Sequence, residues 1–199
     1  MSEPKPHPKL LFLDRDGVIN HDTGYVGKPA DFTFIPGIFT VIHQFVNAGF
    51  LPVIVTNQSG IGRGYYSESD FAALCEWMQN AFTDQGLPYI PVYYCPHHPE
   101  HAQGSYQQLC DCRKPAPGML LAAARDLNAE LSSSVLLGDS WRDIQAGAAA
   151  GLPAQCYINA TPAQEATLGQ SNVFHAPSVA AVTPLIPAII AASKNGSDA

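Results

Sequence analysis

The chain has 199 residues, of which 46% are hydrophobic and 14% are charged, and its formal net charge is −7. This length and hydrophobic share allow one sizeable core, while a negative chain without a basic run excludes the cationic surface that nucleic acid or an anionic membrane requires. We therefore expect a single domain whose partner is a small molecule. Because no stretch approaches eighteen apolar residues and the start is polar, we expect a soluble, cytoplasmic protein, and we expect it to act as a monomer.

Short apolar runs alternate with amphipathic stretches along the chain. In chain order we expect a strand at residues 10–13, a helix between Gly37 and Gly49, a strand at 51–56, a helix from Ser67 to Gly86, a strand at 90–95, a helix from near Pro117, a strand at 133–138, a helix at 144–150, a strand at 155–158 and a helix at 179–192. This alternation predicts an α/β fold, a Rossmann-like open parallel sheet with helices on both faces. Residues 9–192 form the expected domain, between flexible ends at 1–8 and 193–199.

Polar side chains follow three of the expected strands. Residues 14–17 (DRDG) come after the first strand, residues 56–60 (TNQSG) end the second, and residues 138–143 (GDSWRD) end the fourth. Each group alone is also typical of a solvated turn or a helix cap. Because the carboxyl ends of parallel strands meet at one edge of the sheet, where ligands bind, the three groups together predict an active site.

The acidic residues of these groups predict a magnesium site. Ionised Asp14, Asp139 and Asp143 would repel one another unless they share a cation. Oxygen ligands suit Mg²⁺, which often binds through few carboxylates and a substrate phosphate. Such an ion would also neutralise charge during phosphoryl transfer.

Three cysteines and a histidine in an irregular stretch predict a second metal site, of structural zinc. The four expected ligands are Cys95, His97, Cys110 and Cys112. His98 and His101 are alternatives to His97, and a chance grouping of thiols is the alternative to a metal site. A filled ligand set leaves no place for water, so this metal would order the loop at residues 95–112, here called the zinc loop, and with it the following Arg113 and Lys114.

The segments LLFLDRDGVIN, VIVTNQSGIGRG, CRKP and LLGDSWRDIQAG resemble the four motifs of the haloacid-dehalogenase-like phosphohydrolases, in the expected order. The resemblance implies that Asp14 attacks phosphorus, that Asp16 is the general acid and base, and that Thr56 and Lys114 stabilise the phosphoryl group. It also implies the magnesium ligands, which are Asp14, the backbone carbonyl of Asp16, Asp139 and, in a supporting position, Asp143.

The Cys-x-His and Cys-x-Cys-Arg-Lys-Pro pairs narrow the resemblance to heptose-bisphosphate phosphatases and the related histidinol-phosphate phosphatases. The former remove the 7-phosphate of D-glycero-D-manno-heptose 1,7-bisphosphate during surface-polysaccharide synthesis. By this resemblance and by position, the expected substrate contacts are Asn20, Asp22, Thr23, Gly24, Tyr25, Asn57, Gln58, Ser59, Arg63, Arg113 and Ser140. Ser140 departs from the pattern, because the heptose enzymes often carry Lys there.

Three functions remain open at this stage. Heptose-bisphosphate hydrolysis is the first expectation, and histidinol-phosphate hydrolysis shares the same machinery. A binding module that is stabilised by zinc but does not catalyse would need every motif residue to be idle. No large insertion follows the first or second motif, so we expect no large cap domain and an open site suited to a small phosphorylated, sugar-like substrate.

Overall fold

The structure is a computed structural model that describes residues 7–161 and 172–194. Six parallel strands form one sheet in the order β3-β2-β1-β4-β5-β6. Their bounds are β1 Lys9–Leu13, β2 Phe50–Asn57, β3 Val92–Cys95, β4 Glu130–Gly138, β5 Ala154–Ile158 and β6 Val173–Ala176. The predicted single-domain parallel α/β fold is confirmed.

Six helices accompany the sheet in the described residues. Their bounds are α1 Ile38–Asn47, α2 Ser59–Gly62, α3 Glu68–Asp84, α4 Gly118–Asp126, α5 Trp141–Ala149 and α6 Ile186–Lys194. Short 3-10 segments are η1 Pro29–Asp31, η2 Gly104–Tyr106 and η4 Ala180–Leu185. None of the helices in this part of the chain is long and apolar enough to cross a bilayer.

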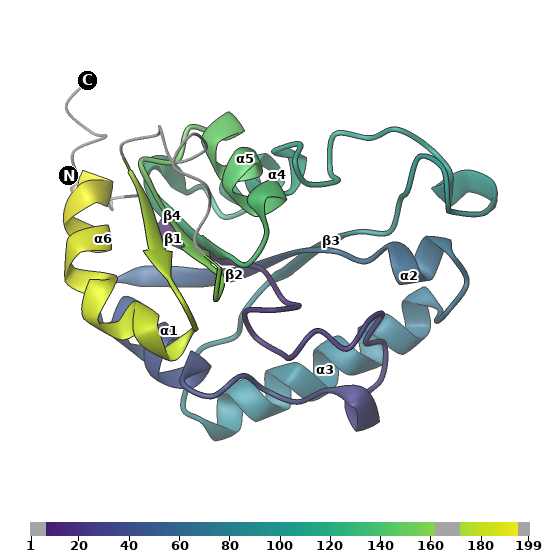
Figure 1. The fold of residues 1–199 in the computed structure, drawn as a ribbon, viewed down its shortest axis with the longest axis horizontal. Helices are drawn as coiled ribbons and strands as arrows, with labels where there is room; N and C mark the ends of the chain where they lie inside the picture. The colour runs from purple at the N-terminus through teal and green to yellow at the C-terminus, as the bar shows by residue number, and fades with distance from the viewer. Residues whose placement is uncertain (1–6, 162–171, 195–199) are drawn as a thin grey trace, which may run out of the picture.

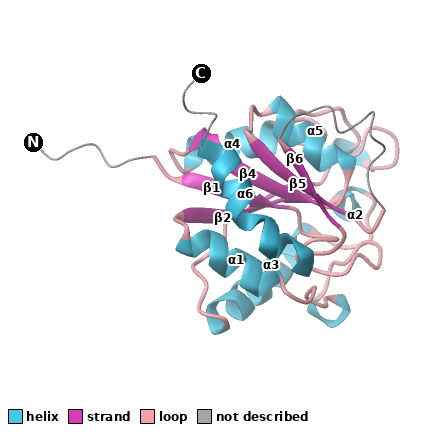
Figure 2. Cartoon of the chain, turned by 60° about the vertical axis from the view of Figure 1, so that its left-hand side comes forward, coloured by secondary structure: helices cyan, strands magenta, loops and turns pink. Residues whose placement is uncertain are grey.

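The two faces of the sheet carry separate apolar cores. Along β1, Leu11 and Leu13 point into the core shared with α1, α3 and α6, while Leu10 and Phe12 point into the core shared with α4 and α5. This alternation follows from the two-residue period of a strand and explains why β1 is apolar at every position from Leu10 to Leu13. Figure 2 shows α4 and α5 on one side of the magenta strands and α1 and α3 on the other.

The strand order places the first and fourth motifs side by side. β1 lies at the centre of the sheet, where Leu13 pairs with Ile54 of β2 on one side and with Leu137 of β4 on the other. The three strands end together, so the loops that follow them gather at one edge (Figure 1). The sheet therefore brings residues 14–17, 56–60 and 138–143 to a common rim, as the sequence predicts.

Several predicted elements differ from the observed ones. The strand β6 was not predicted, since its four residues VFHA carry too short an apolar run to stand out. The short helix α2 follows β2 where no helix was predicted, and α5 begins at Trp141 rather than at residue 144, because Ser140 caps it. Ser140 donates hydrogen bonds to the Asp143 carboxylate from both its backbone N–H (3.0 Å) and its hydroxyl (2.9 Å).

The last predicted helix, at residues 179–192, is also corrected. Pro184 lies inside a 3-10 segment, and the α-helix begins only at Ile186 and continues to Lys194. Proline interrupts the i to i−4 hydrogen bonds of a helix but is tolerated in its first turn, where Pro187 lies.

At the amino-terminal end of the described chain, the Pro8 carbonyl accepts a hydrogen bond from the Glu130 N–H at 3.0 Å. The flexibility expected at residues 1–6 and 195–199 lies outside the described residues.

Candidate active site

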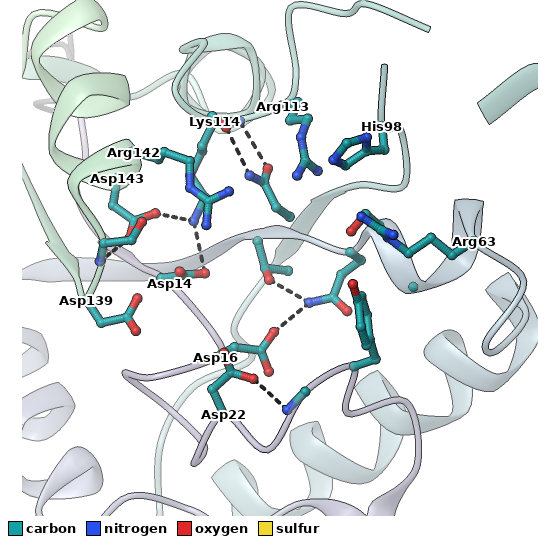
Figure 3. A pocket seen from close by; sticks show the side chains of 18 of the residues that line it. Asp14, Asp16, Asp22, Arg63, His98, Arg113, Lys114, Asp139, Arg142 and Asp143 are labelled. Atoms are coloured by element: carbon teal, nitrogen blue, oxygen red, sulfur yellow. Dashed lines mark hydrogen bonds and ion pairs between the residues drawn. The ribbon is translucent and has the colours of Figure 1, made fainter. Parts of the chain in front are cut away.

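A pocket of about 450 Å³ lies at the rim where β1, β2 and β4 end. All four residues expected to take part in chemistry line it, as do the expected magnesium ligands; together these are Asp14, Asp16, Thr56, Lys114, Asp139 and Asp143. Figure 3 shows the carboxylates of Asp14, Asp139 and Asp143 gathered on one side of the pocket, with Asp16 below Asp14 in this view. The structure thus brings together residues that are far apart along the chain.

One oxygen of Asp14 is held by two donors. The Arg15 backbone N–H donates to Oδ1 at 2.7 Å, and Lys114 Nζ lies 2.9 Å from the same oxygen. In the part of the chain that the structure describes, no hydrogen bond or ion pair engages Oδ2. The carboxylate is therefore fixed in orientation, and its second oxygen remains available to a metal ion or a phosphorus atom.

Lys114 is the cation at the centre of the acidic cluster. Its side chain is only 2% exposed, and Nζ lies 2.6 Å from Asp143 Oδ1 as well as 2.9 Å from Asp14. Burial acts to lower the pKa of Lys114, but the two carboxylates outweigh burial and raise it, so the amine stays charged. The Asn57 side chain fixes the Lys114 backbone by accepting from its N–H and donating to its carbonyl, both at 3.0 Å.

The acidic cluster is suited to a hard cation. One carboxylate oxygen from each of Asp14, Asp139 and Asp143 lies within 4.8 Å of the others. Burial, followed by the charge of Asp143, raises the pKa of Asp139 to about 7, and burial also raises the pKa of Asp14. Because Lys114 alone does not neutralise three carboxylates, the donor set fits the Mg²⁺ ion that the sequence predicts.

Glycine makes room for this cluster at two places. Gly17 has a φ of +85°, and a Cβ there would lie 1.9 Å from Asp139 Oδ2. At Gly138, a Cβ would lie 2.3 Å from the Asp143 Cβ. Both distances are far inside van der Waals contact, so the acidic side chains occupy space that only glycine leaves open.

A hydrogen-bond network joins Asp16 to Thr56. The Gln58 side-chain amide donates to Thr56 Oγ1 at 2.7 Å and to Asp16 Oδ2 at 3.0 Å, and its oxygen accepts from the Tyr66 hydroxyl at 2.5 Å. Since Thr56 Oγ1 accepts from Gln58, the hydrogen of the Thr56 hydroxyl is free to donate into the pocket. Gln58 was expected to contact substrate, but its amide is already engaged within the protein.

The expected zinc ligands form one cluster. Their four ligand atoms all lie within 4.8 Å of one another, and the sulfur of Cys112 lies 3.1 Å from Cys95, 3.3 Å from Cys110 and 3.4 Å from His97 Nδ1. Tetrahedral zinc with Zn–S bonds of about 2.3 Å separates its sulfurs by about 3.8 Å, so the arrangement is close to a zinc site. His98 and His101, the alternatives to His97, are outside the cluster.

The expected substrate contacts divide into two groups. Those that line the pocket are Asp22, Gly24, Tyr25, Asn57, Gln58, Ser59, Arg63, Arg113 and Ser140. Thr23 and Asn20 are not among the lining residues, and Asn20 is fully buried, with its side-chain amide donating to Asp16 Oδ1 and to the His21 carbonyl, both at 3.0 Å.

Four further residues line the pocket that were not named individually as contacts, and they are Gly60, Tyr66, His98 and Arg142. Gly60 and Arg142 belong to the predicted groups 56–60 and 138–143, and His98 belongs to the zinc loop. His98 has its Nδ1 engaged by the backbone N–H groups of Glu100 and His101, which leaves Nε2 as the nitrogen able to face a ligand. The signal for Arg142 was its position inside the GDSWRD segment, directly before Asp143 of the acidic cluster. Figure 3 shows Arg63, His98 and Arg113 along one side of the pocket.

Comparison with known proteins places the chain among phosphatases. The HAD-hydrolase-like family model matches residues 111–166. A D-glycero-alpha-D-manno-heptose-1,7-bisphosphate 7-phosphatase of Burkholderia mallei is 51% identical over 144 residues, 72% of this chain and 76% of that protein. A D-glycero-beta-D-manno-heptose-1,7-bisphosphate 7-phosphatase of Vibrio cholerae is also 51% identical, over 71% of this chain and 76% of that protein.

A solved structure extends the similarity to the fold. The D,D-heptose 1,7-bisphosphate phosphatase from B. bronchiseptica, complexed with magnesium and phosphate, superposes with a TM-score of 0.75 at 33% identity. The match covers 90% of this chain and 98% of that one. Magnesium in that complex agrees with the donor set formed here by the acidic cluster.

Proposed function

Because this chain belongs to the D-glycero-D-manno-heptose-1,7-bisphosphate 7-phosphatase family of HAD-like hydrolases, we propose that it removes the 7-phosphate of D-glycero-D-manno-heptose 1,7-bisphosphate. The observation that carries the proposal is the arrangement of Asp14. Its Oδ1 contacts Lys114 and the Arg15 N–H, while its Oδ2 has no partner among the described residues and lies near Asp139. A carboxylate held in this way is arranged to attack phosphorus rather than to support the fold.

The reaction has two steps in this proposal. In the first, Asp14 Oδ2 forms a bond to phosphorus, the bond from phosphorus to the sugar oxygen breaks, and Asp16 gives a proton to that oxygen. In the second, Asp16 takes a proton from water, the resulting hydroxide attacks phosphorus, and phosphate leaves Asp14. Asp14 and Asp16 both line the pocket, so both carboxylates can reach a phosphate group bound there.

Other residues stabilise the phosphoryl group during both steps. The Thr56 hydroxyl donates to its oxygens, which carry the negative charge of the transition state, and the Lys114 ammonium supplies positive charge beside them. Magnesium would be held by Asp14, the Asp16 carbonyl and Asp139, with Asp143 in support, and when bound it supplies positive charge that offsets repulsion between carboxylate and phosphate. Zinc would be held by Cys95, His97, Cys110 and Cys112, away from the reacting atoms.

A bisphosphate suits the distribution of charge in the pocket. Lys114 lies beside Asp14, whereas the guanidinium groups of Arg63, Arg113 and Arg142 line the pocket elsewhere. Arg63 Nε is buried and has no hydrogen-bond partner among the described residues. These cations would bind the phosphate and hydroxyl groups that are not hydrolysed. The cytoplasm is the proposed compartment, since none of the five cysteines forms a disulfide in the structure.

The test is magnesium-dependent phosphate release from each anomer of the heptose bisphosphate, with histidinol phosphate as the competing substrate. We expect heptose 1-phosphate as the product, identified by NMR. Asp14→Asn should lower turnover about 10³-fold or more, while Asp84→Asn, on an exposed residue at the end of α3, should not change it. Faster turnover of histidinol phosphate, or an active Asp14→Asn variant with an unchanged fold, would contradict the proposal.

A further inference from the structure

Arg15, between the proposed nucleophile and the proposed acid and base, is fully buried. Its side chain is 0% exposed and is the largest of the completely buried side chains. Burying a guanidinium costs free energy unless it is paired, and an apolar residue of similar volume is often at least as stabilising. Stability alone therefore gives little reason for arginine at this position.

The contacts of Arg15 are directed at Asp16. Nη2 donates to Asp16 Oδ1 at 2.6 Å and to Oδ2 at 2.9 Å, and Nε donates to Oδ1 at 3.2 Å. The planar fork of the guanidinium thus fixes both the position and the rotation of the carboxylate, which a lysine with its single ammonium could not do. Asp16 itself is 22% exposed, on the pocket side.

Arg15 also connects this carboxylate to two other parts of the site. Its Nη2 donates to the Val26 carbonyl at 2.8 Å, at the end of the segment 20–25 that carries expected substrate contacts. Its backbone N–H donates to Asp14 Oδ1. On the far side, the guanidinium lies 5.6 Å from the ring centre of Phe71 in α3, which limits its movement.

We propose that Arg15 is a positioning residue. It aligns the Asp16 carboxylate with Asp14 and holds the segment 20–26 next to these two aspartates. This inference rests on the proposed function, in which Asp16 transfers the proton. Asn20 and Gln58 each donate one hydrogen bond to Asp16 at 3.0 Å, but each of these amides makes a single contact with the carboxylate. Among the described residues, only Arg15 donates hydrogen bonds to both oxygens of the Asp16 carboxylate.

A double-mutant cycle on kcat tests the proposal. The variants are Arg15→Lys, Asp16→Asn and the two combined, assayed on the heptose bisphosphate at saturating substrate. We expect Arg15→Lys to lower kcat about tenfold or more and to change KM less than about threefold. The reason is that the substitution slows proton transfer by Asp16 but leaves substrate binding unchanged. In the Asp16→Asn background the same substitution should change kcat less than about twofold, since Arg15 acts through Asp16.

The matched control is Arg125→Lys. Arg125 pairs with the next residue, Asp126, at 3.0 Å in the same i, i+1 arrangement, but its side chain is 75% exposed and lies outside the pocket. The kcat of the Arg125→Lys variant should equal that of the wild type. Additive effects of Arg15→Lys and Asp16→Asn, or an unchanged kcat in Arg15→Lys, would overturn the proposal and leave Arg15 a purely structural residue.

Folding and substrate identity are checked separately. If thermal unfolding shows that Arg15→Lys does not fold, Arg15→Gln, which is neutral and lacks the Nη2 atom that contacts Asp16 and Val26, replaces it in the cycle under the same criteria. If the wild type hydrolyses an aryl phosphate but not the heptose bisphosphate, the proposed substrate is wrong, and the cycle run on the aryl phosphate still decides the role of Arg15.

Discussion

At the scale of single residues, the site depends on a missing side chain as much as on those present. Gly17 leaves the space that Asp139 fills, and its φ of +85° lies in the region that disfavours other residues. Gly17→Ala should therefore displace Asp139 and weaken magnesium binding. We expect the magnesium concentration for half-maximal activity to rise about tenfold or more, measured by titration of the apo-protein.

Gly151→Ala separates the effect of backbone strain from the effect of collision. Gly151 has a similar φ of +78°, but a Cβ there meets no atom within 4 Å. Both variants should lose about 1 kcal/mol of unfolding free energy or somewhat more, whereas only Gly17→Ala should lose magnesium affinity. Equal magnesium affinities in the two variants would mean that Asp139 does not need this space.

The convergence of the charged residues could be predicted from the sequence, but their individual contacts could not. Asp14, Lys114 and Asp139 meet because strand order fixes where a loop begins. The direction of a side chain depends on rotamers and neighbours, so nothing in the sequence indicated that Asn20 and Gln58 would turn toward Asp16. For the same reason, only the spacing of the cysteine and histidine residues favoured His97 over His98 as the zinc ligand.

At the scale of elements, the zinc loop is the segment whose ordered structure depends most on a bound metal rather than on the burial of apolar side chains. It contains only the three-residue segment η2, and its ends meet at the four clustered ligands. Because Cys112 directly precedes Arg113 and Lys114, loss of the metal should disturb both cations. Cys110→Ser should abolish the bound zinc, expected at about one per chain, and lower turnover together with the melting temperature.

Cys75→Ser provides the comparison for this variant. Cys75 is a half-buried free thiol in α3, outside the cluster. It should retain zinc and wild-type turnover, measured by atomic emission and phosphate release. A zinc-free Cys110→Ser protein with unchanged turnover and melting temperature would show that the loop is ordered without the metal.

The elements that were predicted well are those with strong periodicity or long apolar runs. The helix α3 begins where its capping box predicts, since Ser67 and Asp70 hydrogen-bond to each other's backbone N–H groups. The strand β6 pairs with β5 at the edge of the sheet, and its stability comes from that pairing. A four-residue strand of this kind carries little signal of its own.

At the scale of the whole molecule, the pocket gathers residues that are widely spaced along the sequence, from Asp14 to Asp143. We predict that the protein acts as a monomer. Sedimentation equilibrium should give a mass near 21.3 kDa, and specific activity should not depend on protein concentration. A dimer whose activity falls on dilution would contradict this prediction.

The order of the strands has a consequence for the nascent protein. Asp14, at the end of the central strand, leaves the ribosome before Lys114, whose ammonium group neutralises it. Until then, packing the sheet around Asp14 would bury a charge without a counterpart. The segment that emerges before Lys114 is therefore expected to stay loosely assembled around this aspartate, and the catalytic rim to close only after Lys114 has emerged.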